Sequence, residues 1–187
     1  MSIALQPIKR TDPRILGNMA VHYSQPRGFV GRNICYAVLW GDTYHGAIVG
    51  GSATLHLPGR NEFFGLTNTT SKDLNRIINN IFYHVEKVNG EYPVRWFTAK
   101  ALAAFRAQIQ IDWKAKYGDD ILGFETLVEL PRTGECYKRD GWELVGQTKG
   151  YTCKRTAGKG TDNWSGKRVW DTENLRPKHV FCKRVMP

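Results

Sequence analysis

No stretch of this 187-residue chain is apolar over the roughly 20 residues that a bilayer-spanning helix needs. The first residues also lack the basic start, apolar run and small-residue cleavage site of a secretory leader. We therefore expect no membrane association, no export and a cytoplasmic location. Hydrophobic residues make up 41% of the chain, which is enough for one core. A single domain over residues 1–187 is expected.

Cysteine is scarce, and its four positions are scattered: Cys35, Cys136, Cys153 and Cys182. No two form a Cys-x-x-Cys pair and no His stands at the spacing of a zinc finger, so neither a structural zinc site nor a disulfide framework is favoured. The glycine-rich fingerprints of Walker and dinucleotide-binding loops are also missing. Gly50-Gly51 lies inside a strand pattern, where it indicates a bulge or a close backbone approach.

Positive charge is plentiful and unevenly placed. The net charge is +10, and residues 138–187 carry twelve Lys and Arg against five Asp and Glu. The net charge of +7 on these last 50 residues predicts a polyanionic partner, because neutralising phosphates releases condensed counterions. Trp142, Tyr151, Trp164 and Trp170 lie among these charges and could stack on unpaired bases. The alternative is a solvated basic surface that serves solubility, with the aromatic rings buried beneath it.

Periodicity and breaking residues predict an α+β fold, a mixed and mostly antiparallel sheet flanked by helices. A first helix should open at Thr11 or Asp12 and run to about His22. Thr98 should cap the best helix, which ends at Gly118. The expected strands are Asn33–Trp40, His45–His56, Ile77–Val88, Ile121–Leu130, Trp142–Thr148 and His179–Met186, with a short helix at Thr133–Arg139.

Three segments give weaker patterns. Residues 61–66 suggest a strand or a loop, and residues 72–80 suggest a helix start or an irregular strand. From about 150 to 177, glycine and basic residues predict an irregular basic arm. The strands that flank the long helix should pair in parallel, because a helical crossover joins them.

Two carboxylates stand four apart on one predicted strand. Alternation places Glu125 and Glu129 on the same face, where either could act as a general base if that face lines a cleft. The alternative is an ion pair with Arg132, Lys138 or Arg139. The residues leave open which of the two acids would be the base.

Several other residues could carry chemistry. His22 and Tyr23 end the first helix beside a Pro-Gly loop and could supply a metal ligand, a proton donor or a stacking face. Tyr137, in the short helix, could donate a proton or orient a carbonyl oxygen. Arg32 and Arg76 could bind an anionic group. For each, a packed or solvated structural role is the competing interpretation.

The layout resembles the GNAT acyltransferase fold, and the residues resemble the phage Mom family of DNA-modification proteins. The resemblance spans most of the chain, and its C-terminal part is the more specific. It is carried by His22-Tyr23-Ser24, Gly28–Arg32, Phe124–Glu129, Thr133–Lys138, Gly141-Trp142, Val145–Gly150 and Pro177–Phe181.

This resemblance implies conversion of adenine N6 in DNA to N6-carbamoylmethyl (methylcarbamoyl) adenine, which protects phage DNA from restriction. The partner would be double-stranded DNA with a flipped adenine, in a phage-infected or prophage-carrying bacterial host. The family's His-Tyr pair matches His22 and Tyr23. Its acidic strand-end residue matches Glu129, where the family usually has Asp. Its functional Arg is assigned to Arg76, with Arg95 second.

The donor site departs from the GNAT pattern. GNAT enzymes that use acyl-CoA carry a glycine-containing loop before the long helix, whereas this chain has Pro93–Lys100 without glycine. Arg95 and Thr98 are the predicted donor-binding residues. The family product contains an N–CH2 bond that simple acyl transfer does not make. Acyl-CoA, another donor, and iron held by His22 and Tyr23 are therefore all kept open.

DNA contacts are expected from six basic residues, Arg32, Lys149, Lys154, Arg155, Lys167 and Arg168. Two other functions are weighed beside DNA modification. One is a non-catalytic DNA-binding accessory protein on the same fold, and the other is a GNAT N-acyltransferase that acts on another amine. A pocket shared by the paired acids and His22-Tyr23 would favour modification over the accessory role.

Overall fold

The computed structural model describes residues 2–24, 26–53, 57–155 and 168–185, with side chains at all of these except 152–155, 168 and 169. Seven strands form one sheet in the order β1-β2-β3-β4-β5-β9-β6, and two more form a separate pair. The strands of the sheet are Ile3–Ile8 (β1), Asn33–Trp40 (β2), Thr43–Ser52 (β3), Ile77–Val85 (β4), Gly123–Glu129 (β5), Glu143–Gln147 (β6) and Lys178–Arg184 (β9).

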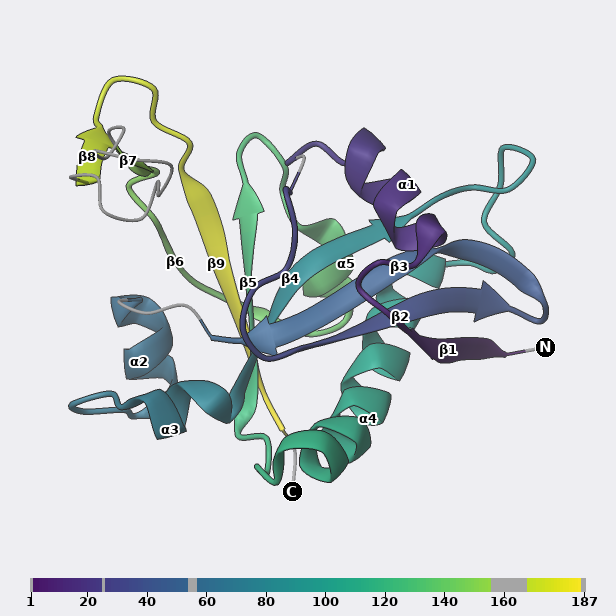
Figure 1. The fold of residues 1–187 in the computed structure, drawn as a ribbon, viewed down its shortest axis with the longest axis horizontal. Helices are drawn as coiled ribbons and strands as arrows, with labels where there is room; N and C mark the ends of the chain where they lie inside the picture. The colour runs from purple at the N-terminus through teal and green to yellow at the C-terminus, as the bar shows by residue number, and fades with distance from the viewer. Residues whose placement is uncertain (1, 25, 54–56, 156–167, 186–187) are drawn as a thin grey trace, which may run out of the picture.

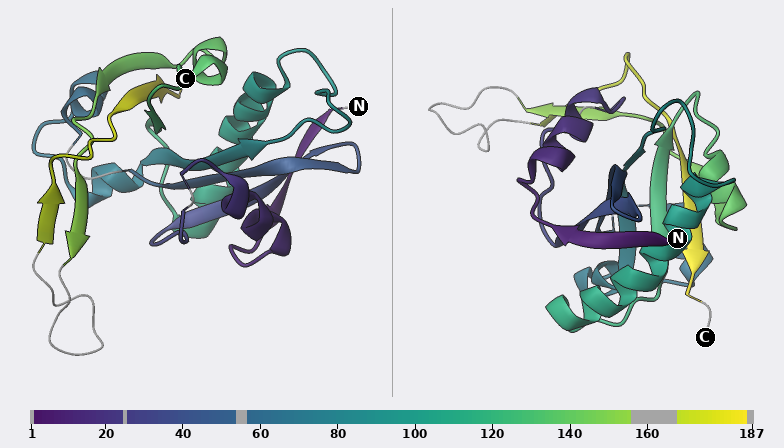
Figure 2. Two further views of the ribbon diagram at one scale, coloured as in Figure 1. Left: turned by 90° about the horizontal axis from the view of Figure 1, so that it is seen from above. Right: turned by 90° about the vertical axis from the view of Figure 1, so that its right-hand side faces the viewer.

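Helices cover both faces of this sheet. They are Pro13–Val21 (α1), Pro58–Phe64 (α2), Ser71–Asn75 (α3), Phe97–Tyr117 (α4) and Glu135–Arg139 (α5). Figure 2 shows α4 on one side of the β2–β3 ribbon and α1 on the other. The long helix α4 buries Leu102, Phe105, Ile109 and Trp113 completely. These residues and Phe124 of β5 form the main core.

The α+β fold is as predicted, and its parallel pair is where expected. β4 and β5, which flank α4, pair in parallel, and every other pairing in the sheet is antiparallel. The start of α1 is also confirmed: the Asp12 side chain accepts from the Arg14 N–H, and Pro13 is the first helical residue.

The parallel pair is short, and the two strands then separate. Ile77–Asn79 pair with Gly123–Glu125, after which the ladder stops. On its other side β4 has a bulge, since Asn80 pairs with Gly50 and Phe82 with Val49. The Asn80 side-chain amide bridges this bulge by donating to the carbonyls of Val49 and Phe82, at 3.1 and 3.0 Å. In Figure 1, β4 and β5 diverge toward the upper edge of the sheet.

Several local predictions are wrong. Residues 61–66 belong mainly to helix α2, because Pro58 suits a first helical turn and Gly65 ends the helix in a left-handed conformation. Strand β1 was not predicted. The prediction for residues 72–80 is confirmed in both of its alternatives: Lys72 lies in helix α3, capped by a Thr70–Asp73 capping box, and β4, which has a bulge, begins two residues after that helix. Residues 54–56 of the predicted second strand lie outside the described residues.

The arm at 150–177 is not wholly irregular. Thr152–Arg155 (β7) and Arg168–Asp171 (β8) pair antiparallel, and the residues between them lie outside the described part. Figure 1 shows this ribbon projecting beyond the ends of β6 and β9. The helix cap at Thr98 is also wrong, since α4 begins after Trp96. Trp96 has a positive φ of 60°, a conformation that costs a non-glycine residue about 1 kcal/mol.

A buried ion pair joins α2 to the sheet. Arg60 Nη1 lies 2.5 Å from Glu125 Oε2, and both side chains are fully buried. Two buried charges depend on each other, because removing one leaves the other without its compensating charge in a low-dielectric interior.

We predict that Glu125→Ala lowers the free energy of unfolding by about 3–5 kcal/mol, because it removes the carboxylate that compensates the buried charge of Arg60. Urea denaturation monitored by circular dichroism measures this. The double substitution Arg60→Met with Glu125→Leu should recover most of the loss. Glu143→Ala, on the exposed face of β6, is the matched control and should change stability by less than about 0.5 kcal/mol. A Glu125→Ala value as small as the control's would contradict the assigned role.

Candidate active site

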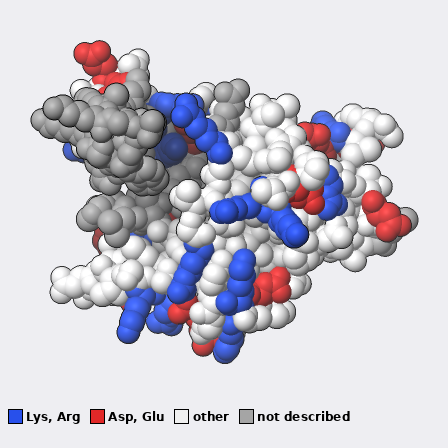
Figure 3. All heavy atoms as spheres, in the orientation of Figure 1, with Lys and Arg blue, Asp and Glu red and all other residues white. Residues whose placement is uncertain are grey.

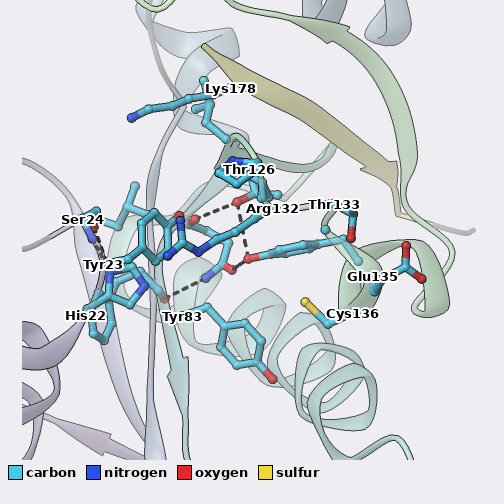
Figure 4. A pocket seen from close by; sticks show the side chains of 18 residues that line it. His22, Tyr23, Ser24, Tyr83, Thr126, Arg132, Thr133, Glu135, Cys136 and Lys178 are labelled. Carbon is cyan, nitrogen blue, oxygen red and sulfur yellow. Dashed lines mark hydrogen bonds between the residues drawn. The ribbon is translucent and has the colours of Figure 1, made fainter. Parts of the chain in front are cut away.

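A cavity of about 570 Å³ occupies the gap between the diverging strands β4 and β5. β4 contributes Asn80 through Tyr83, and β5 contributes Thr126 through Val128. The loop after α1 and the turn into α5 close its sides (Figure 4). Its volume lies within the range of small-molecule binding sites.

Three planar side chains in contact form the mouth of this cavity, with the His22 and Tyr23 rings tilted by 38°. The Tyr23 ring lies 4.3 Å from the His22 ring, and the Arg132 guanidinium carbon lies 3.6 Å from the Tyr23 ring centre. Burial raises the pKa of Tyr23, and the neighbouring Arg132 guanidinium and Glu129 backbone moderate that rise. Tyr23 thus reaches from the loop after α1 to the end of β5. Figure 4 shows Tyr23 and Arg132 overlapping at the centre of the pocket. We call His22, Tyr23 and Arg132 the mouth stack.

His22 is held as a neutral ring. Its Nδ1 accepts from the Ser24 backbone N–H at 3.3 Å and lies 2.8 Å from the Ser24 hydroxyl oxygen. Its other nitrogen therefore carries the proton, which it donates to the Tyr83 carbonyl. Burial, with the neighbouring His84 ring, lowers the pKa of His22 to about 4. His22 is consequently uncharged at neutral pH and is a weak base.

The floor of the cavity is a buried hydrogen-bond cluster. The Tyr137 hydroxyl donates to Asn80 Oδ1 at 2.6 Å, and the Thr126 hydroxyl donates to the Asn80 carbonyl at 3.1 Å. Burial raises the pKa of Tyr137 well above its usual value of about 10. Tyr137 therefore keeps its proton at neutral pH and can serve as an acid but not as a base.

Neither predicted carboxylate lines this cavity. Glu125 is buried against Arg60 on the α2 side of β5. Glu129 lines a neighbouring cavity, where Arg176 Nη2 and Nε donate to its Oε1 at 2.6 and 3.0 Å. Alternation puts Glu125, Leu127 and Glu129 on one face of β5, but of these three residues Leu127 alone lines the cavity. The sequence could not show this, because both faces of β5 are covered.

Other predicted residues lie apart from the cavity. Arg76 ends α3 and donates to the Asp120 carbonyl at 3.2 Å, near the start of β4 rather than beside the pocket. Arg32 pairs with Asp119 at 2.5 Å and lies over the Tyr117 ring. Lys149 lies at the neighbouring cavity. Lys167 lies outside the described residues, as do the side chains of Lys154, Arg155 and Arg168.

The start of α4 offers a second polar feature near the cavity. No side chain caps its first turn, and the Arg95 guanidinium carbon lies 4.5 Å from the Trp96 ring centre. Arg139 lies over the same ring at 5.9 Å. Tyr83, which lines the cavity, donates to the Thr98 carbonyl in this turn at 2.6 Å. A 21-residue helix with two flanking cations can hold an anion here without a glycine loop.

The donor set does not suit an iron site at His22 and Tyr23. The Nδ1 lone pair of His22 is engaged by Ser24, and its other nitrogen faces the Tyr83 carbonyl. No group of three His, Cys, Asp or Glu converges within the described residues. Cys136 lines the cavity, but burial raises its pKa to about 11, so its thiol is inert.

The cavity is also lined by residues that were not predicted to belong to the site: Arg132, Asn80, Thr126 and Lys178. Arg132 directly follows the strand-ending Leu130-Pro131, and loop residues after strand ends often carry function. Asn80, in an otherwise apolar run, was the other available signal, since a polar side chain within a buried strand needs hydrogen-bond partners.

No protein-family model matches this chain, and no curated protein matches it by sequence. Solved structures do match its fold. The ribosomal L7/L12 α-N-protein acetyltransferase RimL aligns with a TM-score of 0.54 at 10% identity, over 98% of this chain and 94% of RimL. NAA60 of Arabidopsis thaliana, solved with a bisubstrate analogue, aligns at 0.52 and 11% identity over 98% of each chain.

A third match is a GNAT acetyltransferase from Elizabethkingia anophelis with acetyl-CoA bound. It aligns at 0.50 and 9% identity, over 98% of this chain and 99% of that one. The chain thus has the fold of GNAT acetyltransferases. Within its described part, no helix is both long enough and apolar enough to cross a membrane.

We predict that burial of neutral His22 makes stability depend on pH. The folded pKa of about 4 lies below the usual value of about 6.5, so the unfolded chain binds more protons between these values. The free energy of unfolding should rise by up to about 3 kcal/mol as pH rises from 4 to 6.5. Denaturant titrations across this range measure it.

His22→Asn should remove that share of the pH dependence, whereas His179→Asn, outside the cavity, should retain it. An unchanged pH profile in His22→Asn would show that another group is responsible.

Proposed function

We propose that this protein is a GNAT-fold transferase that moves a group from an acyl-CoA-type donor onto the exocyclic N6 amine of adenine in DNA. One observation carries the proposal: a cavity opens where β4 and β5 separate, with a protonated tyrosine at its floor and a stack of planar side chains at its mouth. The donor would enter from the α4 side, and the base would enter at the mouth stack.

The planar side chains at the mouth of the cavity favour a nucleobase as the acceptor. Flipped or unpaired bases stack on aromatic rings and on guanidinium planes, and the mouth stack offers both. The charged lining residues are Arg132, Lys178 and Glu135, an excess of cations that suits a nucleotide. His22 and Tyr23, which carry the resemblance to Mom proteins, lie together with Tyr137 around this one cavity.

The donor would be anchored at the start of α4. The uncapped helix terminus, Arg95 and Arg139 would attract the donor's phosphates. The Elizabethkingia anophelis neighbour, which shares the fold, was solved with acetyl-CoA bound. Beyond Asn79 and Glu125 the facing edges of β4 and β5 are unpaired with each other, so their backbone groups can hold an extended acyl-pantetheine arm.

The reaction requires one proton to be delivered to the leaving group and one proton to be removed from the attacking amine. As the amine nitrogen attacks the donor carbonyl, an N–C bond forms and the C–S bond breaks. Tyr137 protonates the departing sulfur, since its raised pKa keeps it in the acid form. The amine proton leaves to water at the mouth, because the low pKa of His22 makes that ring a weak acceptor.

A second acceptor is favoured by the neighbours. RimL is described as a protein α-N-acetyltransferase, so a protein amine is the alternative substrate. The excess of cations around the cavity favours DNA over a protein amine as the substrate, because it attracts an anionic acceptor and repels a cationic peptide terminus.

We predict that DNA from cells expressing the protein contains an adenosine adduct, detected by mass spectrometry of the nucleosides. The mass of the adduct distinguishes a simple acyl group from the carbamoylmethyl group that the Mom resemblance implies. Tyr23→Ala, which dismantles the mouth stack, should abolish the adduct, and Tyr44→Ala, outside the cavity, should retain it. Unmodified DNA together with newly acetylated protein amines would decide for the alternative.

We predict that Tyr137→Phe lowers kcat for adduct formation by roughly 100-fold or more while KM changes little, as removal of a general acid requires. The measurement is the initial rate on an adenine-containing oligonucleotide. Tyr117→Phe removes a phenol outside the cavity and serves as the control. Equal rates in the two variants would exclude Tyr137 as the acid.

A further inference from the structure

A second cavity, of about 350 Å³, adjoins the first beneath the arm. Leu127 and Lys178 line both cavities, so the two are neighbours. The remaining charged residues of the second cavity are Glu129, Lys149 and Arg176. We call it the basic cavity.

The basic cavity has a net positive charge. It contains three cations and one carboxylate, and Glu129 is engaged by Arg176. Within the described part of the chain, neither Lys149 nor Lys178 forms an ion pair with a carboxylate. Glu129 and Arg176 balance each other, so the two ammonium groups leave the described lining of this cavity with a net positive charge, which attracts an anion.

The backbone holds these cations in a fixed frame. Thr148 N–H donates to the Lys178 carbonyl at 2.9 Å, and Arg176 N–H donates to the Gly150 carbonyl at 2.9 Å. The Thr148 hydroxyl accepts from the Lys178 N–H at 3.1 Å. Gly150 has a φ of +82°, and a Cβ there would lie 2.3 Å from the Pro177 nitrogen. Lys149 is therefore fixed against the β9 side by a turn that only glycine permits.

We propose that the basic cavity is a phosphodiester subsite, which holds the backbone of the strand whose base enters the first cavity. The proposal rests on the proposed function for the identity of that base. A phosphate beside a flipped nucleotide must lie next to the base pocket, and the shared Lys178 is placed to bridge the two. Tyr151, which lines the basic cavity and is 47% exposed, offers a stacking face for the neighbouring base.

A single-stranded oligonucleotide, labelled with fluorescein and containing one adenine, tests this by fluorescence anisotropy from 50 to 200 mM salt without any donor. Lys149→Glu should weaken binding at least tenfold. It should also reduce the slope of log affinity against log salt by about 0.7, the value for one lost contact to single-stranded DNA. Lys72→Glu, on α3 and remote from both cavities, makes the same change in net charge and should have a clearly smaller effect.

Three results would overturn the subsite. Equal weakening by Lys149→Glu and Lys72→Glu would indicate a general charge effect. Loss of coenzyme A binding in Lys149→Glu with oligonucleotide binding unchanged would assign the cavity to the phosphates of the donor. Displacement of the oligonucleotide by polyaspartate at equal charge would show that phosphodiesters are not preferred.

The binding assay uses no donor, so it stands apart from the test of transfer. If Lys149→Glu selectively weakens oligonucleotide binding but no nucleoside adduct is found in cells, the subsite is supported and the proposed reaction is contradicted.

Discussion

The early end of the β4–β5 ladder is the constraint on which the rest of the site depends. Three residue pairs join the strands, and then the bulge at Ile81 turns β4 away from β5. Asn80 makes this separation stable, because its side-chain amide donates to the carbonyls of Val49 in β3 and Phe82 in β4 and accepts a hydrogen bond from the Tyr137 hydroxyl. Without that side chain, these buried polar groups would lose this partner.

The gap between β4 and β5 is lined by side chains that other elements of the fold position. α5 places Tyr137 against Asn80, and the loop after α1 places Tyr23 across the gap to the end of β5. Beneath the sheet, Arg60 and Glu125 hold β5 against α2, so the strand keeps its position although it loses its parallel partner after Glu125. The cleft is thus a property of the whole fold rather than of one loop.

The sequence predicted the fold class, the parallel pair and the main helix because periodic burial is a local pattern. Leu102, Phe105, Ile109 and Trp113 repeat at helical spacing and are all buried. Prediction from the sequence failed where long-range packing determines what surrounds a residue. Glu129 and Glu125 share a face as predicted, but only the position of α2 and of the arm determines what that face meets. The role of Arg132 likewise depends on Tyr23, more than a hundred residues away in sequence.

The mouth stack is assembled from two loops that are otherwise independent. Its contacts are the tilted packing of the His22 and Tyr23 rings and the Arg132 guanidinium over the Tyr23 ring, each worth about 1 kcal/mol. None of them belongs to the sheet ladder or to the main core. The entrance can therefore part by rotating two side chains while the strands stay in place. A polymer too large to enter the protein could still present a single nucleotide to its interior.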